Sequence, residues 1–233
     1  MDQVEILLID KPHGITSFDV IRRLRRRYSD SHGGQKAPKL GHSGTLDPLA
    51  TGLMVLGVGK GTKKLAELIK LDKEYVAEVL IGESRTTGDM EGEVVEEKRV
   101  EETEEILRSK ISSALTELVG EIELPVSAYS AIKVDGVPMY KRARKAEKSG
   151  EVVDEVPMRV MKVYEAELLS LEVGGDRAVA TIRFSVASGT YIRSLGEELG
   201  RRLGYPACLK NLRRTKVGEF DIKDAKQIEE VFK

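Results

Sequence analysis

The feature that most constrains this chain is a turn-rich loop followed directly by an apolar run. The loop covers residues 41–52, GHSGTLDPLATG, and the run is Leu53-Met54-Val55-Leu56. Glycine and proline favour turns, and a short run of large apolar residues bounded by turns predicts a buried strand. Asp47 lies in the middle of the loop. The sequence therefore predicts a carboxylate carried on a sharp loop against a rigid strand, as in many active sites.

The proline after Asp47 restricts the backbone of that aspartate. Its ring crowds the preceding residue and moves it out of the helical region into extended geometry, which fixes the direction of the carboxylate. An ordinary turn at Asp47-Pro48 is the alternative that the dipeptide alone leaves open.

Several motifs together resemble those of the TruB-type RNA pseudouridine synthases, which act on uridine 55 of tRNA. The longest is the stretch 41–54, GHSGTLDPLATGLM. The others follow in the order of the family: DKPHGITS at 10–17, KEY at 73–75, SAIKVDG at 130–136, SGTYIRSL at 188–195 and LRR at 212–214. The resemblance extends from about residue 4 to about residue 221.

The resemblance implies an α+β fold, the pseudouridine synthase fold, with a mixed, largely antiparallel sheet flanked by helices and a central basic cleft. It implies one catalytic domain over residues 1–233, with a thumb-like segment at about 127–157 that closes over RNA. Many family members continue into a small C-terminal RNA-binding domain, which we do not expect here. Periodicity alone predicts only a strand-rich mixed protein.

Local patterns predict the individual elements. Ser17 is expected to cap a helix with Phe18, Ile21, Leu24 and Tyr28 on its apolar stripe. The other predicted elements are strands at 4–9 and 73–81, helices at 62–69, 103–119 and 190–203, and a hairpin over 158–186 around Gly174-Gly175-Asp176.

The formal net charge is −1, so a nucleic acid must be bound by local patches. Basic residues cluster at 22–27, 140–148 and 201–216, whereas residues 82–123 are acidic and should face away from RNA. Solvated helix faces are the alternative for the first two clusters. The candidate RNA contacts are Lys11, Arg22, Arg23, Arg26, Lys141, Arg142, Arg144, Arg213 and Arg214. The alternative role for Lys11 is to support the loop that carries Asp47.

The resemblance also implies roles in the chemistry. Asp47 is the catalytic carboxylate, acting on the ribose by nucleophilic attack or by proton abstraction, and Arg193 is its ion-pair partner. Tyr75 stacks on uracil, Tyr191 and Leu212 complete the base pocket, and His42 fills the stack that the flipped base vacates. Core packing is the alternative for Tyr75, Tyr191 and Leu212.

Other site types find little support. Residues 57–62, GVGKGT, lack the first glycine and the Ser or Thr of a P-loop. One cysteine and three histidines have no zinc-ligand spacing, and we expect no metal and no cofactor. There is no signal peptide or long apolar segment, so we expect a cytoplasmic protein without a membrane contact, a monomer whose partner is the T-arm of tRNA, with no obligatory protein partner.

Three other functions remain alternatives. A non-catalytic RNA-binding protein or tRNA chaperone would keep the basic patches without the chemistry. A glycoside hydrolase would need two cooperating carboxylates, whereas the motifs offer one. A dyskerin-like synthase would depend on a guide RNA, but the segment after Tyr129 resembles the stand-alone bacterial type.

Overall fold

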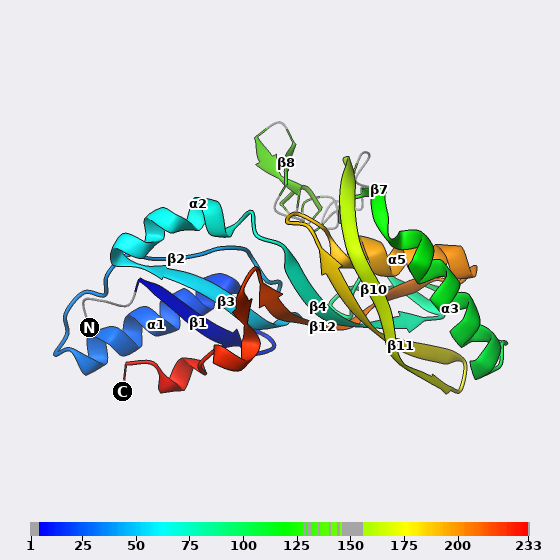
Figure 1. Ribbon diagram of the computed structural model, residues 1–233, viewed down its shortest axis with the longest axis horizontal. Helices are drawn as coiled ribbons and strands as arrows, with labels where there is room; N and C mark the ends of the chain where they lie inside the picture. Colours follow the sequence, from blue (N-terminus) through cyan, green and yellow to red (C-terminus); the bar gives the residue numbers. More distant parts are fainter. Residues whose placement is uncertain are drawn as a thin grey trace. The chain divides into compact units, whose positions relative to one another are not determined.

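The computed structural model describes residues 5–127, 129, 132–134, 136–139, 141–143, 145 and 156–232. The chain divides into two compact units, of which the first comprises residues 1–76, 184–188 and 211–233 and the second residues 77–183 and 189–210. The main sheet has the strand order β1-β3-β12-β4-β11-β10-β7, with β2 beside β3 and β13 beside β12 (Figure 1). It is mixed and mostly antiparallel, and helices accompany it, as the family resemblance implies.

The bounds of the elements are as follows. The helices are α1 (Ser17–Ser31), α2 (Leu65–Leu68), α3 (Glu104–Leu118) and α5 (Ile192–Leu203), and the 3₁₀ helices are η1 (Gly59–Lys64), η2 (Ile222–Asp224) and η3 (Ile228–Glu230). The strands of the main sheet are β1 (Ile6–Lys11), β2 (Leu40–His42), β3 (Thr51–Val58), β4 (Lys73–Ile81), β7 (Gly120–Pro125), β10 (Met158–Gly174), β11 (Arg177–Val186), β12 (Ala207–Val217) and β13 (Phe220–Asp221). Two short hairpins pair β5 (Glu83–Arg85) with β6 (Val94–Glu97) and β8 (Lys133–Val134) with β9 (Val137–Pro138).

The first unit is built around β3. This strand pairs with β1 and β2 in antiparallel register and with β12 in parallel register, where Arg214 lies opposite Gly52. Six consecutive residues of β3 are buried, which confirms the buried strand predicted from the apolar run. Leu53, Val55 and Val217 form a core cluster within this unit. The strand that follows the Asp47 loop is therefore a fixed support for it.

The second unit combines a hairpin with two helices. β10 and β11 flank Gly175 and Asp176, at the predicted turn, and β7 pairs with the start of β10. Helix α3 packs against β10 and against α5 (Figure 1). Buried and half-buried residues alternate along β11, so one face of this strand is covered and the other is partly exposed.

Two predictions about α1 are wrong. Thr16, not Ser17, caps the helix, because Thr16 and Asp19 form a reciprocal capping box. Phe18 is 61% exposed, and Val20 takes its expected place among the buried residues.

The predicted helix at 62–69 is a 3₁₀ turn followed by the single turn α2. Much of the expected thumb at 127–157 lies outside the described residues.

Candidate active site

Residues 43–50, which we call the Asp47 loop, join β2 to β3. The loop begins with a hydrogen bond from the Ser43 amide to the Val55 carbonyl at 3.0 Å. It turns where the Ala50 amide donates to the Asp47 carbonyl at 3.1 Å. Asp47 itself is half-buried, between buried Leu46 and Leu49. The carboxylate is thus carried on a tight turn next to the core.

Helix α1 holds the loop through Ser17. The buried Ser17 Oγ donates to the Leu46 carbonyl at 2.9 Å and accepts from the Leu46 amide at 2.8 Å. Since Thr16 caps the helix, the Ser17 hydroxyl is available for this contact. The residue before Asp47 is therefore fixed on both of its backbone polar groups.

Lys11, at the end of β1, holds the other side of the loop. Its side chain is fully buried, and Nζ donates to the carbonyls of Pro12 at 2.9 Å and Pro48 at 3.3 Å. The Gly14 amide also donates to the Pro48 carbonyl, at 2.8 Å. Lys11 is thus placed to support the loop, which is one of the two roles predicted for it, and a contact with RNA stays a prediction.

Arg214 on β12 is the third support. It is 1% exposed, and its guanidinium donates to the carbonyls of Leu53 at 2.7 Å and Gly44 at 3.2 Å. Arg213 faces a different partner, pairing through two hydrogen bonds with the Asp10 carboxylate at 2.7 and 3.1 Å. Phosphate binding by these two arginines stays a prediction, and the Arg213 side chain is 43% exposed whereas Arg214 is buried. Burial of a cation depends on tertiary structure, which a run of basic residues does not reveal.

Three predicted substrate residues lie in the same unit as Asp47. His42 is half-buried, and burial, aided by the Arg214 charge, lowers its pKa and favours a neutral ring. Tyr75 is buried near the start of β4. Leu212 is half-buried, and its carbonyl accepts a hydrogen bond from Thr51 Oγ1 at 3.4 Å, directly after the Asp47 loop.

Arg193 and Tyr191 belong to the second unit, so their meeting with Asp47 stays a prediction. Tyr191 is the N-cap residue of α5, and Arg193 lies in its first turn, as predicted. Arg193 is 7% exposed, and its guanidinium donates to the carbonyls of Thr87 at 3.2 Å and Tyr129 at 3.4 Å. It also forms an ion pair with Asp89 at 3.5 Å.

Asp89 is a residue that the sequence reasoning missed. It is 2% exposed, and its carboxylate also accepts from Thr87 Oγ1 at 2.6 Å and from the Glu91 amide at 3.1 Å. It lies within the acidic stretch 82–123, which the charge pattern indicates as a face turned away from RNA. The turn Thr86-Thr87-Gly88-Asp89 was the available signal, because such turns orient side chains.

The predicted RNA contacts differ in their surroundings. Arg22 and Arg26 are exposed and pair with Asp19 at 2.8 Å and Asp30 at 3.9 Å, and Arg23 is exposed. Lys141 is exposed, Arg142 donates to the Val134 carbonyl at 2.7 Å, and Arg144 lies outside the described residues.

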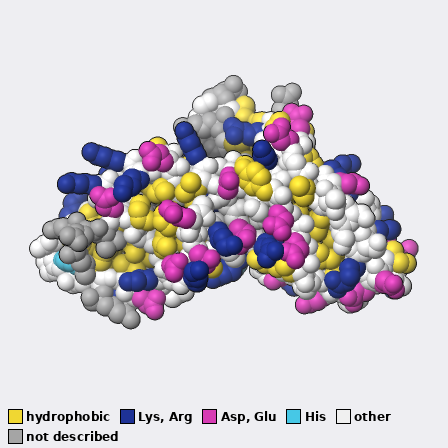
Figure 2. Space-filling model, in the orientation of Figure 1, with side chains coloured by type: hydrophobic (Ala, Val, Ile, Leu, Met, Phe, Trp, Pro, Cys, Tyr) yellow, Lys and Arg dark blue, Asp and Glu magenta, His cyan; other side chains and the backbone are white. Residues whose placement is uncertain are grey.

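The cations at 201–216 are largely paired within the protein. Their carboxylate partners are Glu198 for Arg201 and Arg202, Glu78 for Lys210, Asp10 for Arg213 and Glu74 for Lys216. On the face shown in Figure 2, basic and acidic side chains are interspersed. Because exposed ion pairs are weak and the side chains of Arg201, Lys210 and Lys216 remain exposed, the phosphate-binding strip at 201–216 stays a prediction.

Two further findings concern the described part of the chain only. No group of three or more His, Cys, Asp or Glu side chains in it is arranged to hold a metal ion. None of its helices combines the length and the apolar character needed to cross a membrane.

Comparison with known proteins places these residues in context. Residues 32–192 match the family described as TruB family pseudouridylate synthase, N-terminal domain. The tRNA pseudouridine synthase B of Leifsonia xyli is 43% identical over 223 residues, covering 96% of this chain and 70% of the relative. That of Corynebacterium efficiens is 41% identical over 220 residues, covering 94% and 69%.

Solved structures agree with the fold. A chain in the crystal structure of a Cbf5-Nop10-Gar1 complex superposes with a TM-score of 0.69 at 27% identity, covering 99% of this chain and 54% of that one. A chain in the structure of an H/ACA RNP bound to a substrate RNA containing 2'-deoxyuridine gives 0.66 at 26% identity, covering 99% and 53%. This chain thus spans about half the length of those two chains.

Proposed function

This chain belongs to the TruB family of tRNA pseudouridine synthases, and we propose that its substrate is uridine 55 in the T loop of tRNA. The reaction is an isomerisation without redox change. The bond from ribose to N1 breaks, the uracil turns in place, and a bond to C5 forms. The observation that carries the proposal is the Asp47 loop, held by buried groups from β1, α1 and β12.

Asp47 is the catalytic carboxylate in this proposal. It acts on the ribose either as a nucleophile or as a base whose proton abstraction leads to a glycal. Each route needs the carboxylate ionised and correctly directed. Support comes from the anchored backbone on both sides of Asp47, at Leu46 and Pro48.

Arg193 is the proposed ion-pair partner of Asp47. A carboxylate in a closed site needs an opposite charge, because its transfer out of water is otherwise costly. Arg193 is already buried and held by Thr87, Asp89 and Tyr129, so its guanidinium is preorganised at little entropic cost.

The base pocket is proposed to consist of Tyr75, Tyr191 and Leu212, with Tyr75 against the uracil face. A base in a folded RNA arm must be flipped out to be reached, which costs a few kcal/mol. His42 would occupy the vacated stack, a role that suits a neutral imidazole. Phosphate contacts in a basic cleft would offset the cost, from Arg22, Arg23, Arg26, Lys141, Arg142, Arg144 and Arg213.

Asp47→Asn tests the assignment, because the amide keeps the shape of the side chain and removes its charge. We expect loss of tritium release from a T-loop RNA that carries 5-tritiated uridine, with the dissociation constant for RNA within about threefold of wild type. The control is Asp30→Asn, an exposed carboxylate at the end of α1. Full activity of Asp47→Asn would refute the role of Asp47.

The remaining alternatives have distinct outcomes in the same assay. A non-catalytic RNA-binding protein would bind the T-arm without tritium release. A guide-dependent synthase would release tritium only when a guide RNA is added. The identity of 43% with a tRNA pseudouridine synthase B, against 27% with the Cbf5-complex chain, favours the stand-alone reaction.

A further inference from the structure

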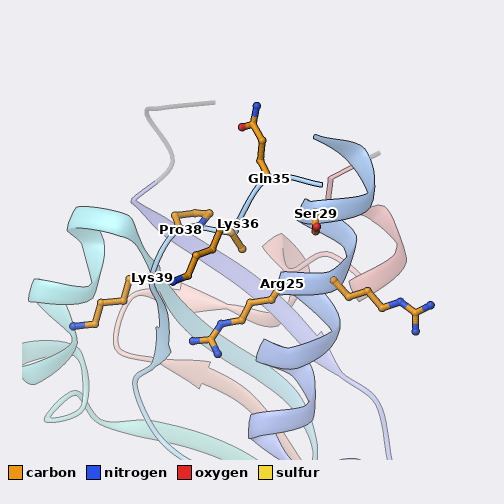
Figure 3. Close-up of a pocket in the computed structure, with 8 residues that line it drawn as sticks. Arg25, Ser29, Gln35, Lys36, Pro38 and Lys39 are labelled. Carbon is orange, nitrogen blue, oxygen red and sulfur yellow. The ribbon is translucent and has the colours of Figure 1, made fainter. Parts of the chain in front are cut away.

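A basic groove lies in the first unit, outside the residues assigned above to chemistry, and shares only Arg26 with the phosphate contacts named above. It has a volume of about 760 Å³ and runs between α1 and the segment that leads to β2 (Figure 3). We call it the α1 groove. Its lining residues are Arg25, Arg26 and Ser29 from α1 and Gln35, Lys36, Ala37, Pro38 and Lys39 from the following segment.

Both walls of the α1 groove are tied to the rest of the unit. On the helix side, Arg27 donates to the carbonyls of Glu229 at 2.6 Å and Val231 at 3.0 Å. The segment is tied at its start by the Gly34 amide to the Ser29 carbonyl and at its end by the Gly59 amide to the Lys39 carbonyl, both at 2.8 Å. The groove is thus held by hydrogen bonds at each end of its second wall.

The charge of the groove is almost uncompensated. Four of its eight lining residues are cations and none is an acid. Arg26 pairs only distantly with Asp30, at 3.9 Å, and within the part of the chain that the structure describes no carboxylate forms an ion pair with Arg25, Lys36 or Lys39. Figure 3 shows Arg25 reaching out from the helix and Lys36 from the facing segment. Cations gathered from two elements repel one another and attract a polyanion.

We propose that the α1 groove binds phosphates of the tRNA strand that flanks the target uridine. This inference rests on the proposed function. Lys39 directly precedes β2, whose last residue is His42, and three extended residues span about 10 Å. Phosphates of one strand repeat about every 3.4 Å along the axis of a B-form duplex and lie farther apart along the strand itself, so that span corresponds to at most about three nucleotides. A strand whose vacated stack is filled by His42 therefore has neighbouring phosphates within reach of Lys39, which lines the groove.

The test is the salt dependence of binding to a T-arm stem-loop. Each phosphate contact contributes about 0.7 to 0.9 to the slope of log K against log salt. Arg25→Gln with Lys36→Gln should make this slope shallower by about 1.4 to 1.8 and raise KM for RNA about tenfold or more at low salt. The turnover at saturating RNA should stay at the wild-type value, because neither side chain takes part in the chemistry.

The matched control is Arg99→Gln with Arg108→Gln, which removes the same charge from two exposed sites in the second unit. The inference is overturned if the groove variant keeps the wild-type slope of log K against log salt. It is also overturned if the control variant makes this slope shallower by the same amount. Tritium release by the wild-type protein is measured in the same series. If the wild type releases tritium and the groove variant keeps the wild-type slope, the groove inference is wrong and the proposed function stands. If the wild type releases no tritium, the proposed function is wrong.

Discussion

At the scale of single residues, the first unit takes three cations out of water and binds them to backbone carbonyls. Lys11 and Arg214 contact the Asp47 loop, and Lys73 donates to the carbonyls of Ile69 and Leu71, each at 2.6 Å. Burying a charge costs free energy unless hydrogen bonds within the protein replace those made with water. These cations therefore fix the backbone carbonyls that they contact. All three lie in the motifs that carry the resemblance to the family, so these motifs encode backbone geometry as well as the proposed chemistry.

The buried amine of Lys73 gives a prediction about pH. Burial, reinforced by the Arg214 charge, lowers its pKa to about 8, whereas the unfolded chain keeps a value near 10.5. Between these values the unfolded state binds more protons, so the free energy of unfolding should rise with pH, by at most about 1.4 kcal/mol per pH unit. Lys73→Met should lack this rise. Urea unfolding of both proteins at pH 7.5, 8.5 and 9.5 measures it, and parallel curves would contradict the buried amine.

The role of a residue could be predicted where it follows from a contiguous motif, and not where it arises from tertiary packing. Asp47 and Arg193 are proposed because their motifs are long and contiguous, and their roles stay predictions. Support of the Asp47 loop is one of the two roles predicted for Lys11. The buried position of Arg214 could not be predicted, since it arises from the packing of β12 against β3. Asp89 was missed for the same reason, because its partner Arg193 is distant in the sequence.

At the scale of elements, strands and helices followed from periodicity, and the details of α1 did not. The hairpin of β10 and β11, the buried β3 and the helix α5 ending at Gly204 were predicted from pattern and turn residues. Thr16 caps α1 because it forms a capping box with Asp19, and this Thr-x-x-Asp pattern is present in the sequence. The contact of the Ser17 hydroxyl with Leu46 is tertiary and cannot be read from the sequence.

The pairing of β3 with β12 depends on Gly52. Its φ of +102° disfavours any side chain, and a Cβ there would lie 2.3 Å from the Arg214 carbonyl oxygen. Gly52→Ala should therefore destabilise the protein by about 3 kcal/mol or more and lower turnover, since β12 must move with Arg214. Gly33→Ala is the control, at φ +60° with nothing within 4 Å, and should cost about 1 kcal/mol. Equal losses in thermal unfolding would contradict this account.

The turn that carries Asp89 positions the Arg193 side chain of α5 for the proposed chemistry. Asp89→Asn removes the charge that holds the Arg193 guanidinium, so we expect turnover to fall at least tenfold while KM for tRNA changes little. Glu93→Gln changes an exposed carboxylate in the same segment and should leave both constants unaltered. A purely structural role for Asp89 would instead lower stability and leave the turnover of the folded fraction at the wild-type value.

At the scale of the whole molecule, the strands β4, β11 and β12 each have residues in both compact units. β12 carries Cys208 in the second unit and Arg214 and Val217 in the first, where Val217 packs with Leu53 and Val55. A strand shared in this way cannot leave one core and stay intact in the other. We therefore expect the two units to unfold together, as a single cooperative transition.

Labelling of Cys208 measures this coupling. The thiol is fully buried, and burial raises its pKa to about 12, so it should react only when the second unit opens. Leu53→Ala acts in the core of the first unit and should cost about 2 to 5 kcal/mol. If the units unfold together, that loss should speed the labelling of Cys208 by about 30-fold or more, because each 1.4 kcal/mol changes the open population tenfold. Phe18→Ala, at an exposed position in the first unit, should leave the rate nearly unchanged. A Leu53→Ala protein with lowered stability but a wild-type labelling rate would show that each unit unfolds by itself.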